Sequence, residues 1–126
     1  MESKKSILVV EDEESHFEVI KVMLESHGYD VFIVRSAQEG IAALESDKHF
    51  DLMWLDHYLS GEGSGLDVIT AARKSEKYKD IPVFLVSNSA GNENIIKYRE
   101  QNITKVFPKF GNKLADIVKA LKDYLD

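Results

Sequence analysis

Residues 7–14 read Ile-Leu-Val-Val-Glu-Asp-Glu-Glu, so four apolar residues are followed directly by four acids. A short apolar run rich in β-branched residues is typical of a strand that is buried on both faces, as in a parallel sheet. The acids mark the point where that strand ends. This stretch therefore predicts a buried first strand with Glu11 and Asp12 at its carboxyl end.

Further strands are predicted by runs of the same character at residues 31–34, 52–55 and 83–86. A fifth and weaker run covers residues 103–107, where Thr104 and Lys105 interrupt the apolar pattern. All five are short, as strands in such a sheet usually are.

Helical patterns separate these runs. In chain order they are an apolar face at residues 17–24 ended by Gly28, a segment opened by the capping box Ser36–Glu39, a segment from Leu66, a polar stretch at 92–101 ended by Asn102, and an apolar stripe at 114–125. Strands that alternate with helices predict a parallel sheet covered on both faces. With right-handed crossovers, the fold class is a doubly wound α/β sandwich.

Length and composition narrow the function classes. The 126 residues are the size of one domain, expected to span 1–126. The absence of cysteine excludes disulfides, zinc thiolate sites and a cysteine nucleophile. The net charge of −6, from 16 basic and 22 acidic residues, argues against direct nucleic-acid binding. No apolar run has the length of a membrane span or a secretory signal, so we expect a cytoplasmic protein.

The ends of the predicted strands carry the residues with the most chemistry. Glu11 and Asp12 end the first strand, Asp56 the third and Ser87 the fourth, while Lys109 follows the fifth. Because sites in such sheets lie beyond the carboxyl ends of the strands, we expect these side chains to converge. Two carboxylates about 4 Å apart repel by roughly 4 kcal/mol at an effective dielectric of 20. Lys109 and a divalent ion would offset this, and Mg²⁺ favours a few carboxylates together with a phosphate oxygen.

This pattern resembles the receiver domain of two-component response regulators, in particular the single-domain chemotaxis type. The resemblance rests on residues 7–13, 50–56 and 81–87 and on Lys109, and it covers nearly the whole chain. It implies a flavodoxin-like sheet in the order 2-1-3-4-5 with five helices. It also implies a regulator that assists its own phosphorylation and dephosphorylation and is otherwise not an enzyme.

The resemblance further implies a role for each residue at the strand ends. Asp56 would accept phosphate from a phosphohistidine; Glu11, Asp12, Asp56 and the backbone carbonyl of Tyr58 would bind Mg²⁺; Ser87 and Lys109 would contact the phosphoryl group. The expected partners are a histidine kinase or histidine phosphotransfer protein, and a downstream protein bound through the fourth helix, fifth strand and fifth helix.

Several positions depart from the family pattern. Asn88 stands where a small residue is usual, Ser60 where a proline is usual, and the loop at 60–65 is one residue longer. Phe110 follows Lys109 in place of proline. Asn88 and Phe110, together with Val106, keep open the alternative of a pseudo-receiver, a protein-interaction module that is rarely or never phosphorylated.

Val106 replaces the aromatic residue by which the family usually signals. Its side chain is too short and stiff to swing into the space that a moving hydroxyl vacates. We therefore expect the switch to be a backbone rearrangement of residues 87–92 and of the start of the fourth helix.

Two other function classes share this architecture. A flavodoxin-like cofactor binder would need phosphate-binding hydroxyls and amides after the first strand, where residues 11–14 are acids. A phosphohydrolase that forms an aspartyl phosphate would need a second acid at position 58, which is tyrosine. Both classes are disfavoured.

Overall fold

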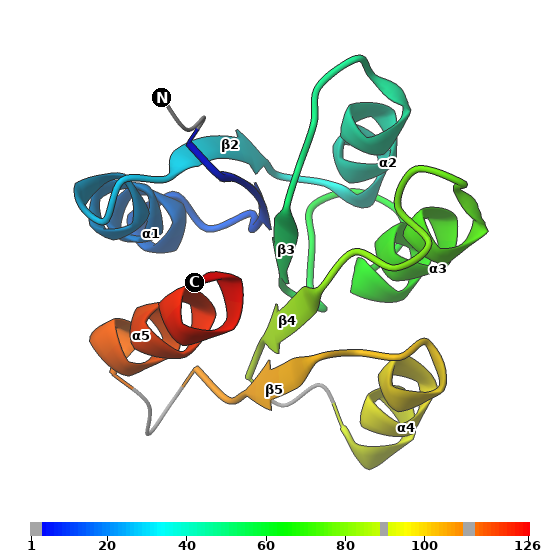
Figure 1. Cartoon of the computed structure of the whole chain (residues 1–126). Helices are drawn as coiled ribbons and strands as arrows, with labels where there is room; N and C mark the ends of the chain where they lie inside the picture. Colours follow the sequence, from blue (N-terminus) through cyan, green and yellow to red (C-terminus); the bar gives the residue numbers. More distant parts are fainter. Residues whose placement is uncertain (1–3, 89–90, 110–112) are drawn as a thin grey trace.

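The computed structural model of the chain describes residues 4–88, 91–109 and 113–126. Its centre is a parallel sheet in the order β2-β1-β3-β4-β5, as predicted (Figure 1). In chain order the strands are β1 (Ser6–Val10), β2 (Asp30–Val34), β3 (Leu52–Leu55), β4 (Val83–Val86) and β5 (Lys105–Phe107).

Five helices cover the two faces of the sheet. They are α1 (Glu14–Ser26), α2 (Ala37–Glu45), α3 (Gly65–Lys74), α4 (Asn92–Glu100) and α5 (Leu114–Leu125). Figure 1 shows α1 and α5 together on one face and α2, α3 and α4 on the other. The doubly wound α/β class is therefore confirmed.

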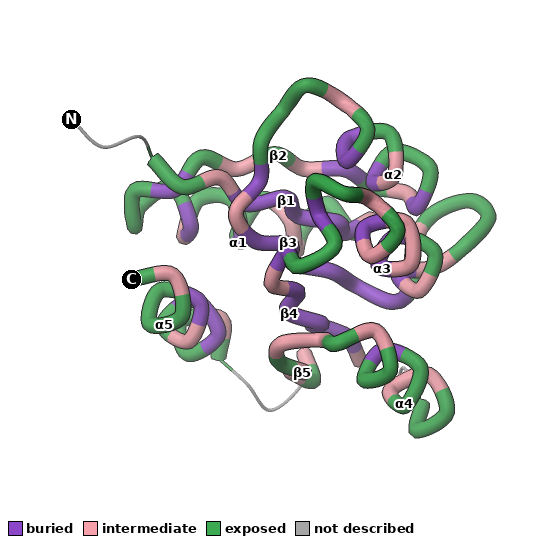
Figure 2. The backbone as a smooth tube through the Cα atoms, turned by 45° about the vertical axis from the view of Figure 1, so that its right-hand side comes forward, coloured by how far each residue is buried: buried purple, intermediate pink, exposed green. Residues whose placement is uncertain are grey.

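Alternating strand residues divide the core into two layers. Leu8 and Val10 pack with α2, α3 and α4, whereas Ile7 and Val9 pack with α1 and α5. This alternation follows from the two-residue period of a strand, which points successive side chains to opposite faces. Figure 2 shows the result, with the central strands β1, β3 and β4 buried and the outer surfaces of the helices exposed.

The predicted helix ends are largely confirmed. The hydroxyl of Ser36 accepts a hydrogen bond from the backbone N–H of Glu39 at 3.1 Å and donates to its carboxylate at 3.1 Å. Gly28 and Asn102 adopt positive φ angles of 90° and 59° just after α1 and α4. The third helix begins at Gly65, one residue before the prediction, because Ser64 forms a full capping box there.

The fifth strand is shorter than the predicted 103–107. Thr104 lies beside β4, but its hydroxyl accepts a hydrogen bond from the N–H of Val83 at 3.0 Å. The Thr104 side chain thus accepts from a backbone N–H that the strand ladder would otherwise use. The strand begins at Lys105, two residues later than predicted. Phe110 and part of the loop 87–92 lie outside the described residues.

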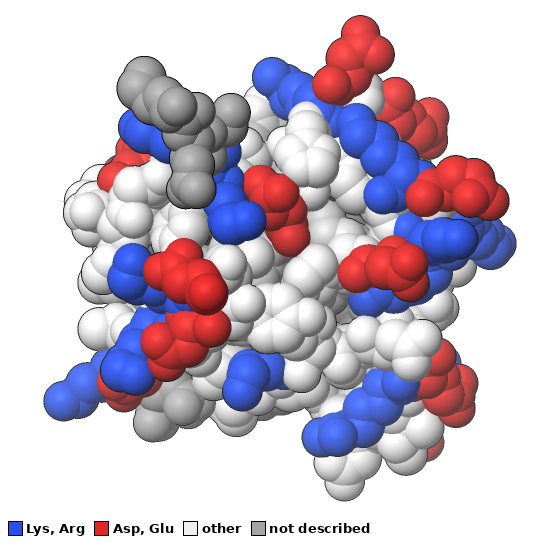
Figure 3. All heavy atoms as spheres, in the orientation of Figure 1, with Lys and Arg blue, Asp and Glu red and all other residues white. Residues whose placement is uncertain are grey.

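Charged side chains of both signs are mixed on the surface. On the face drawn in Figure 3, acidic and basic groups lie next to one another around an uncharged centre. Across the described ranges 4–88, 91–109 and 113–126, no helix combines the length and the apolar character that crossing a membrane requires.

Candidate functional site

The backbone of the sheet positions three of the predicted site residues. Glu11, Asp56 and Ser87 each follow the last residue of a strand, and the N–H of each donates to a carbonyl of the neighbouring chain segment at 3.0 Å. The acceptors are the carbonyls of Val34, Val10 and Phe107, respectively. Since these bonds continue the ladder one residue beyond the strands, the three side chains are held at one edge of the sheet.

Carboxylates accumulate at this edge. Glu11, Asp12 and Asp56 each offer an oxygen, and these oxygens lie within 4.8 Å of one another. Glu11 and Asp56 are buried, with exposed fractions of 1% and 5%. Burial raises the pKa of Glu11, and the charge of Asp56 raises it further against the opposing hydrogen bond from Lys109. The buried carboxylates therefore carry more negative charge than the protein and water around them stabilise.

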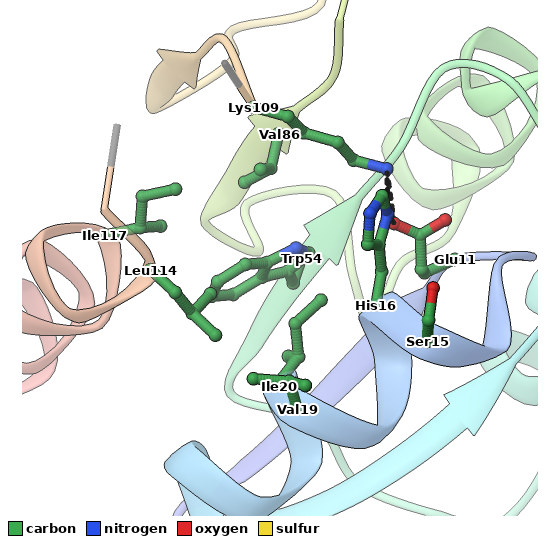
Figure 4. Close-up of a pocket in the computed structure, with 10 residues that line it drawn as sticks. All are labelled: Glu11, Ser15, His16, Val19, Ile20, Trp54, Val86, Lys109, Leu114 and Ile117. Carbon is green, nitrogen blue, oxygen red and sulfur yellow. Dashed lines mark hydrogen bonds and ion pairs between the residues drawn. The ribbon is translucent and has the colours of Figure 1, made fainter. Parts of the chain in front are cut away.

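Lys109 lies between these carboxylates. Its Nζ donates to Oδ2 of Asp56 at 2.8 Å and also to Glu11. Burial alone would lower the pKa of Lys109, but its hydrogen bonds to Asp56 and Glu11 raise the pKa overall. Figure 4 shows the lysine extending across the pocket to Glu11 and His16, whose Nδ1 is 3.3 Å from the ammonium. Lys109, which the sequence predicts to converge with the acids, is thus a charged group in direct contact with Asp56.

The loops around the acids add further contacts. The N–H of Tyr58 lies 3.3 Å from Oδ1 of Asp56, which places the backbone of Tyr58 beside that carboxylate. The hydroxyl of Ser60 donates to Oδ2 of Asp12 at 3.2 Å, and Arg35 donates to the Asp12 carbonyl at 3.1 Å. Ser60, a departure from the family pattern, therefore orients one of the predicted metal ligands.

The donor set fits a small divalent cation. Carboxylate oxygens are the ligands that Mg²⁺ and Mn²⁺ prefer. Here three carboxylates converge, those of Glu11, Asp12 and Asp56. The single positive charge of Lys109 does not balance them, although it contacts both Glu11 and Asp56. An acidic cluster of this kind can bind a metal ion.

Ser87 offers a hydroxyl at the same edge. Its Oγ is buried and has no hydrogen-bond partner among the described residues. A buried hydroxyl without a partner is costly, on the order of 1–3 kcal/mol. It is a donor placed where an incoming oxygen would satisfy it.

Two contacts near the site were not predicted. The side chain of His57, the residue after Asp56, is buried, and its Nδ1 lies 2.7 Å from the hydroxyl of Tyr98. His16 contacts Lys109 and Glu11. A signal for Tyr98 was present in the sequence, because it stands three residues after Ile95 on an otherwise polar helix.

A pocket of about 220 Å³ lies beside the acids between α1 and α5 (Figure 4). Trp54 lines the pocket and is buried, as expected for a residue of the predicted strand 52–55. Leu114 and Ile117 line the α5 side. The lining of the pocket is apolar except at the end formed by Glu11, Ser15, His16 and Lys109.

Comparison with known proteins agrees with this geometry. The model of the response regulator receiver domain matches residues 7–122. The polar-differentiation response regulator DivK of Brucella ovis is 34% identical over 95 residues, which are 74% of this chain and 76% of DivK. The phosphate regulon transcriptional regulatory protein PhoB of Pseudomonas aeruginosa is 33% identical over 82% of this chain and 46% of its own length.

Solved structures show the same fold. A CheY-like response regulator receiver domain protein from Methanospirillum hungatei JF-1 superposes with a TM-score of 0.89 at 27% identity, covering 98% of this chain and 95% of its own. The receiver domain of sensor histidine kinase PA1611 from Pseudomonas aeruginosa, with magnesium coordinated in its active site cleft, has a TM-score of 0.82 at 22% identity over 96% and 97% of the chains.

Proposed function

The chain belongs to the response regulator receiver family, the phosphoryl-accepting switches of two-component signalling, and we propose that Asp56 is its phosphoryl acceptor. The observation that carries this proposal is the 2.8 Å contact between Asp56 and Lys109 at the edge where three carboxylates meet. Ser87, whose hydroxyl has no partner among the residues that the structure describes, and Lys109 would each donate a hydrogen bond to a phosphoryl oxygen.

The proposed reaction is transfer from a phosphohistidine of a kinase or phosphotransfer protein. An oxygen of Asp56 attacks the phosphorus, a P–O bond forms as the P–N bond breaks, and the leaving imidazole takes up a proton from water. Lys109 neutralises charge that develops on the phosphoryl oxygens. Glu11, Asp12, Asp56 and the carbonyl of Tyr58 would hold Mg²⁺. When bound, the ion supplies further charge neutralisation.

Receiver domains interact with histidine kinases or phosphotransfer proteins and with downstream partners. For this chain we place the downstream contact on α4, β5 and α5, and we treat residues 1–126 as one receiver unit. Ile96 on α4 and Tyr124 on α5 support that placement, because they are large apolar side chains with exposed fractions of 56% and 51%.

A pseudo-receiver is not favoured. The acids, hydroxyl and lysine lie together at one edge of the sheet, and Ser60 replaces the usual proline while contacting Asp12. Because a small residue is usual at position 88, we expect the side chain of Asn88 to narrow the approach to Asp56. Phe110 lies outside the described residues.

Intact-mass measurement tests the acceptor. With Mg²⁺ and acetyl phosphate, the protein should gain one phosphoryl group, and Asp56→Asn should abolish the gain. Asp51→Asn is the matched control, because Asp51 is a half-buried aspartate just before the same strand at its opposite end. An unchanged mass of the unmodified protein with several phosphodonors would favour the pseudo-receiver instead.

A further inference from the structure

Tyr98 connects α4 to the chain segment that contains Asp56 and His57. Among the residues of α4, all of which the structure describes, Tyr98 is the buried one, and its exposed fraction is 0%. Its hydroxyl lies 2.7 Å from Nδ1 of His57, the residue that follows Asp56. The two rings meet edge to face, with centroids 5.6 Å apart. One buried hydrogen bond therefore joins the helix to the chain segment at Asp56.

Burial shifts the pKa of both partners of this bond. Burial, and after it the negative charge of Asp56, raises the pKa of Tyr98 above its usual value. Burial lowers the pKa of His57 against the opposing charge of Asp56. The hydrogen bond lies in a buried setting, because Tyr98 and His57 are both buried, and an unmade bond there is costly.

The surroundings of the bond leave it little room to stretch. A Cβ added at Gly65 would lie 2.5 Å from the carbonyl oxygen of Asp56 and 2.5 Å from the Tyr98 hydroxyl. The N–H of Gly65 donates to the carbonyl of His57 at 3.0 Å. The hydroxyl, the Asp56 backbone and the start of α3 therefore form one close-packed contact.

Tyr98 also lies in the core layer against which Val106, the residue that replaces the usual aromatic, packs. Val106 on β5 packs against the same core layer as Tyr98, and Leu85 of that layer is the strand partner of Val106. An aromatic ring from α4 thus lies in the layer to which β5 contributes only a small side chain.

The two ends of α4 are held differently. At the carboxyl end, Arg73 of α3 donates to the carbonyls of Gln101 at 2.7 Å and Asn102 at 3.2 Å. The side chain of Gln101 also donates to Thr70 at 2.7 Å. At the amino end, Gly91 provides no side-chain cap. A pull on Tyr98 would therefore pivot the helix about its carboxyl end.

We propose that the His57–Tyr98 hydrogen bond transmits the phosphorylation state of Asp56 to α4. This coupling rests on the proposed role of Asp56 as phosphoryl acceptor. It describes how phosphorylation of that residue would change the position of α4. A phosphoryl group moves the segment of Asp56 and His57 towards new contacts. Because leaving a buried donor unpaired is costly, the Tyr98 hydroxyl follows His57 and the amino-terminal half of α4 moves with it.

Hydrogen exchange with and without beryllium fluoride and Mg²⁺, which together mimic the phosphoryl group, tests the coupling. In the unmodified protein, exchange of residues 91–98 should change when the mimic binds. In Tyr98→Phe the mimic should still bind, but the change at 91–98 should shrink by at least about threefold. Tyr78→Phe is the matched control, because Tyr78 is a buried tyrosine of the same core layer with a hydrogen-bonded hydroxyl, and it should respond fully.

Substitutions of His57 provide a second, independent test, because they remove the other partner of the hydrogen bond. His57→Leu should uncouple α4 as Tyr98→Phe does. His57→Asn keeps a polar atom near the position of Nδ1 and should restore part of the response. A loss of the response in the tyrosine control as well would show that the effect is general destabilisation, and this would overturn the inference.

The outcomes separate this inference from the acceptor assignment. If the unmodified protein binds the mimic and both Tyr98→Phe and His57→Leu keep the full change at 91–98, the coupling is wrong while the Asp56 assignment stands. If the mimic leaves the exchange of the unmodified protein unchanged everywhere, the acceptor assignment fails, and the coupling fails with it.

Discussion

The two edges of the sheet treat buried polar groups in opposite ways. At the amino-terminal edge, the carboxylate of Asp51 accepts from the N–H of Ser6 at 2.8 Å and contacts His49 at 2.9 Å. The buried hydroxyl of Tyr78 donates to the carbonyl of Lys48 and accepts from the N–H of Phe50. Each of these groups is matched by partners of its own.

At the carboxyl-terminal edge, the buried polar groups have too few hydrogen-bonding and charge partners. Glu11 and Asp56 share the ammonium of Lys109, and the hydroxyl of Ser87 has no partner within the described part of the chain. Such an edge lowers stability in the resting protein, and under the proposed function a cation and a phosphoryl group would supply the missing partners. The amino-terminal edge thus stabilises the fold, whereas the carboxyl-terminal edge gives up stability for its proposed function.

The largest expected effect concerns Arg73 at the amino-terminal edge. Its guanidinium donates to five backbone carbonyls, those of Gln101, Tyr78, Lys79, Ile81 and Asn102. Arg73→Met should lower the free energy of unfolding by roughly 3 kcal/mol, because it leaves several of these carbonyls unpaired. Urea denaturation measures this. An equal loss from Lys74→Met, its neighbour on α3, would mean that the carbonyl contacts are unimportant.

The next effect has the opposite sign. Asp56→Asn removes one of two buried acids that share Lys109, so it should raise the free energy of unfolding by about 1–2 kcal/mol. The raised pKa of Glu11, to which the charge of Asp56 contributes, motivates this expectation. Urea denaturation at low ionic strength and pH 7 is the measurement. A loss of stability equal to that of Asp51→Asn would remove the proposed contrast between the edges.

Mg²⁺ should stabilise the carboxyl-terminal edge by a similar amount. At a free concentration ten times its Kd, an ion that binds only the folded protein adds about 1.4 kcal/mol. Asp12→Asn should abolish most of this gain. Glu13→Gln should leave it nearly intact, since Glu13 is exposed and contacts His16. Mg²⁺ titration followed by Trp54 fluorescence gives the affinities, and equal losses in the two variants would refute the assignment of the acidic pair.

The smallest effect is expected at Asp51. Burial alone would raise its pKa, but hydrogen bonds from Ser6 and His49 outweigh burial and lower it. A depressed folded-state pKa contributes stability above the unfolded value, about 3.9, and that stability is lost as pH falls through the folded value. Asp51→Asn should therefore cost about 1 kcal/mol at pH 7 and progressively less below about pH 4. A cost that is constant from pH 7 to pH 2.5 would show that the charge is irrelevant.

The sequence alone determined the fold class, the strand order implied by the family resemblance, and the identity of the residues at the carboxyl-terminal edge. Short apolar runs define buried strands, and parallel strands bring their ends to one edge whatever the details of packing. Glu11, Asp56 and Ser87 could therefore be placed from their positions after those runs. Their roles in phosphoryl transfer and metal binding remain predictions.

Only the tertiary structure decided which groups touch. His57 and Tyr98 are 41 positions apart, and Ser60 and Asp12 are 48 apart, so no local pattern pairs them. Whether α4 turns Tyr98 towards His57 depends on how that helix packs over Gly65, and a rotation by one residue would point it elsewhere. Contacts of this kind depend on the packing of several elements at once, and for that reason the sequence did not reveal them.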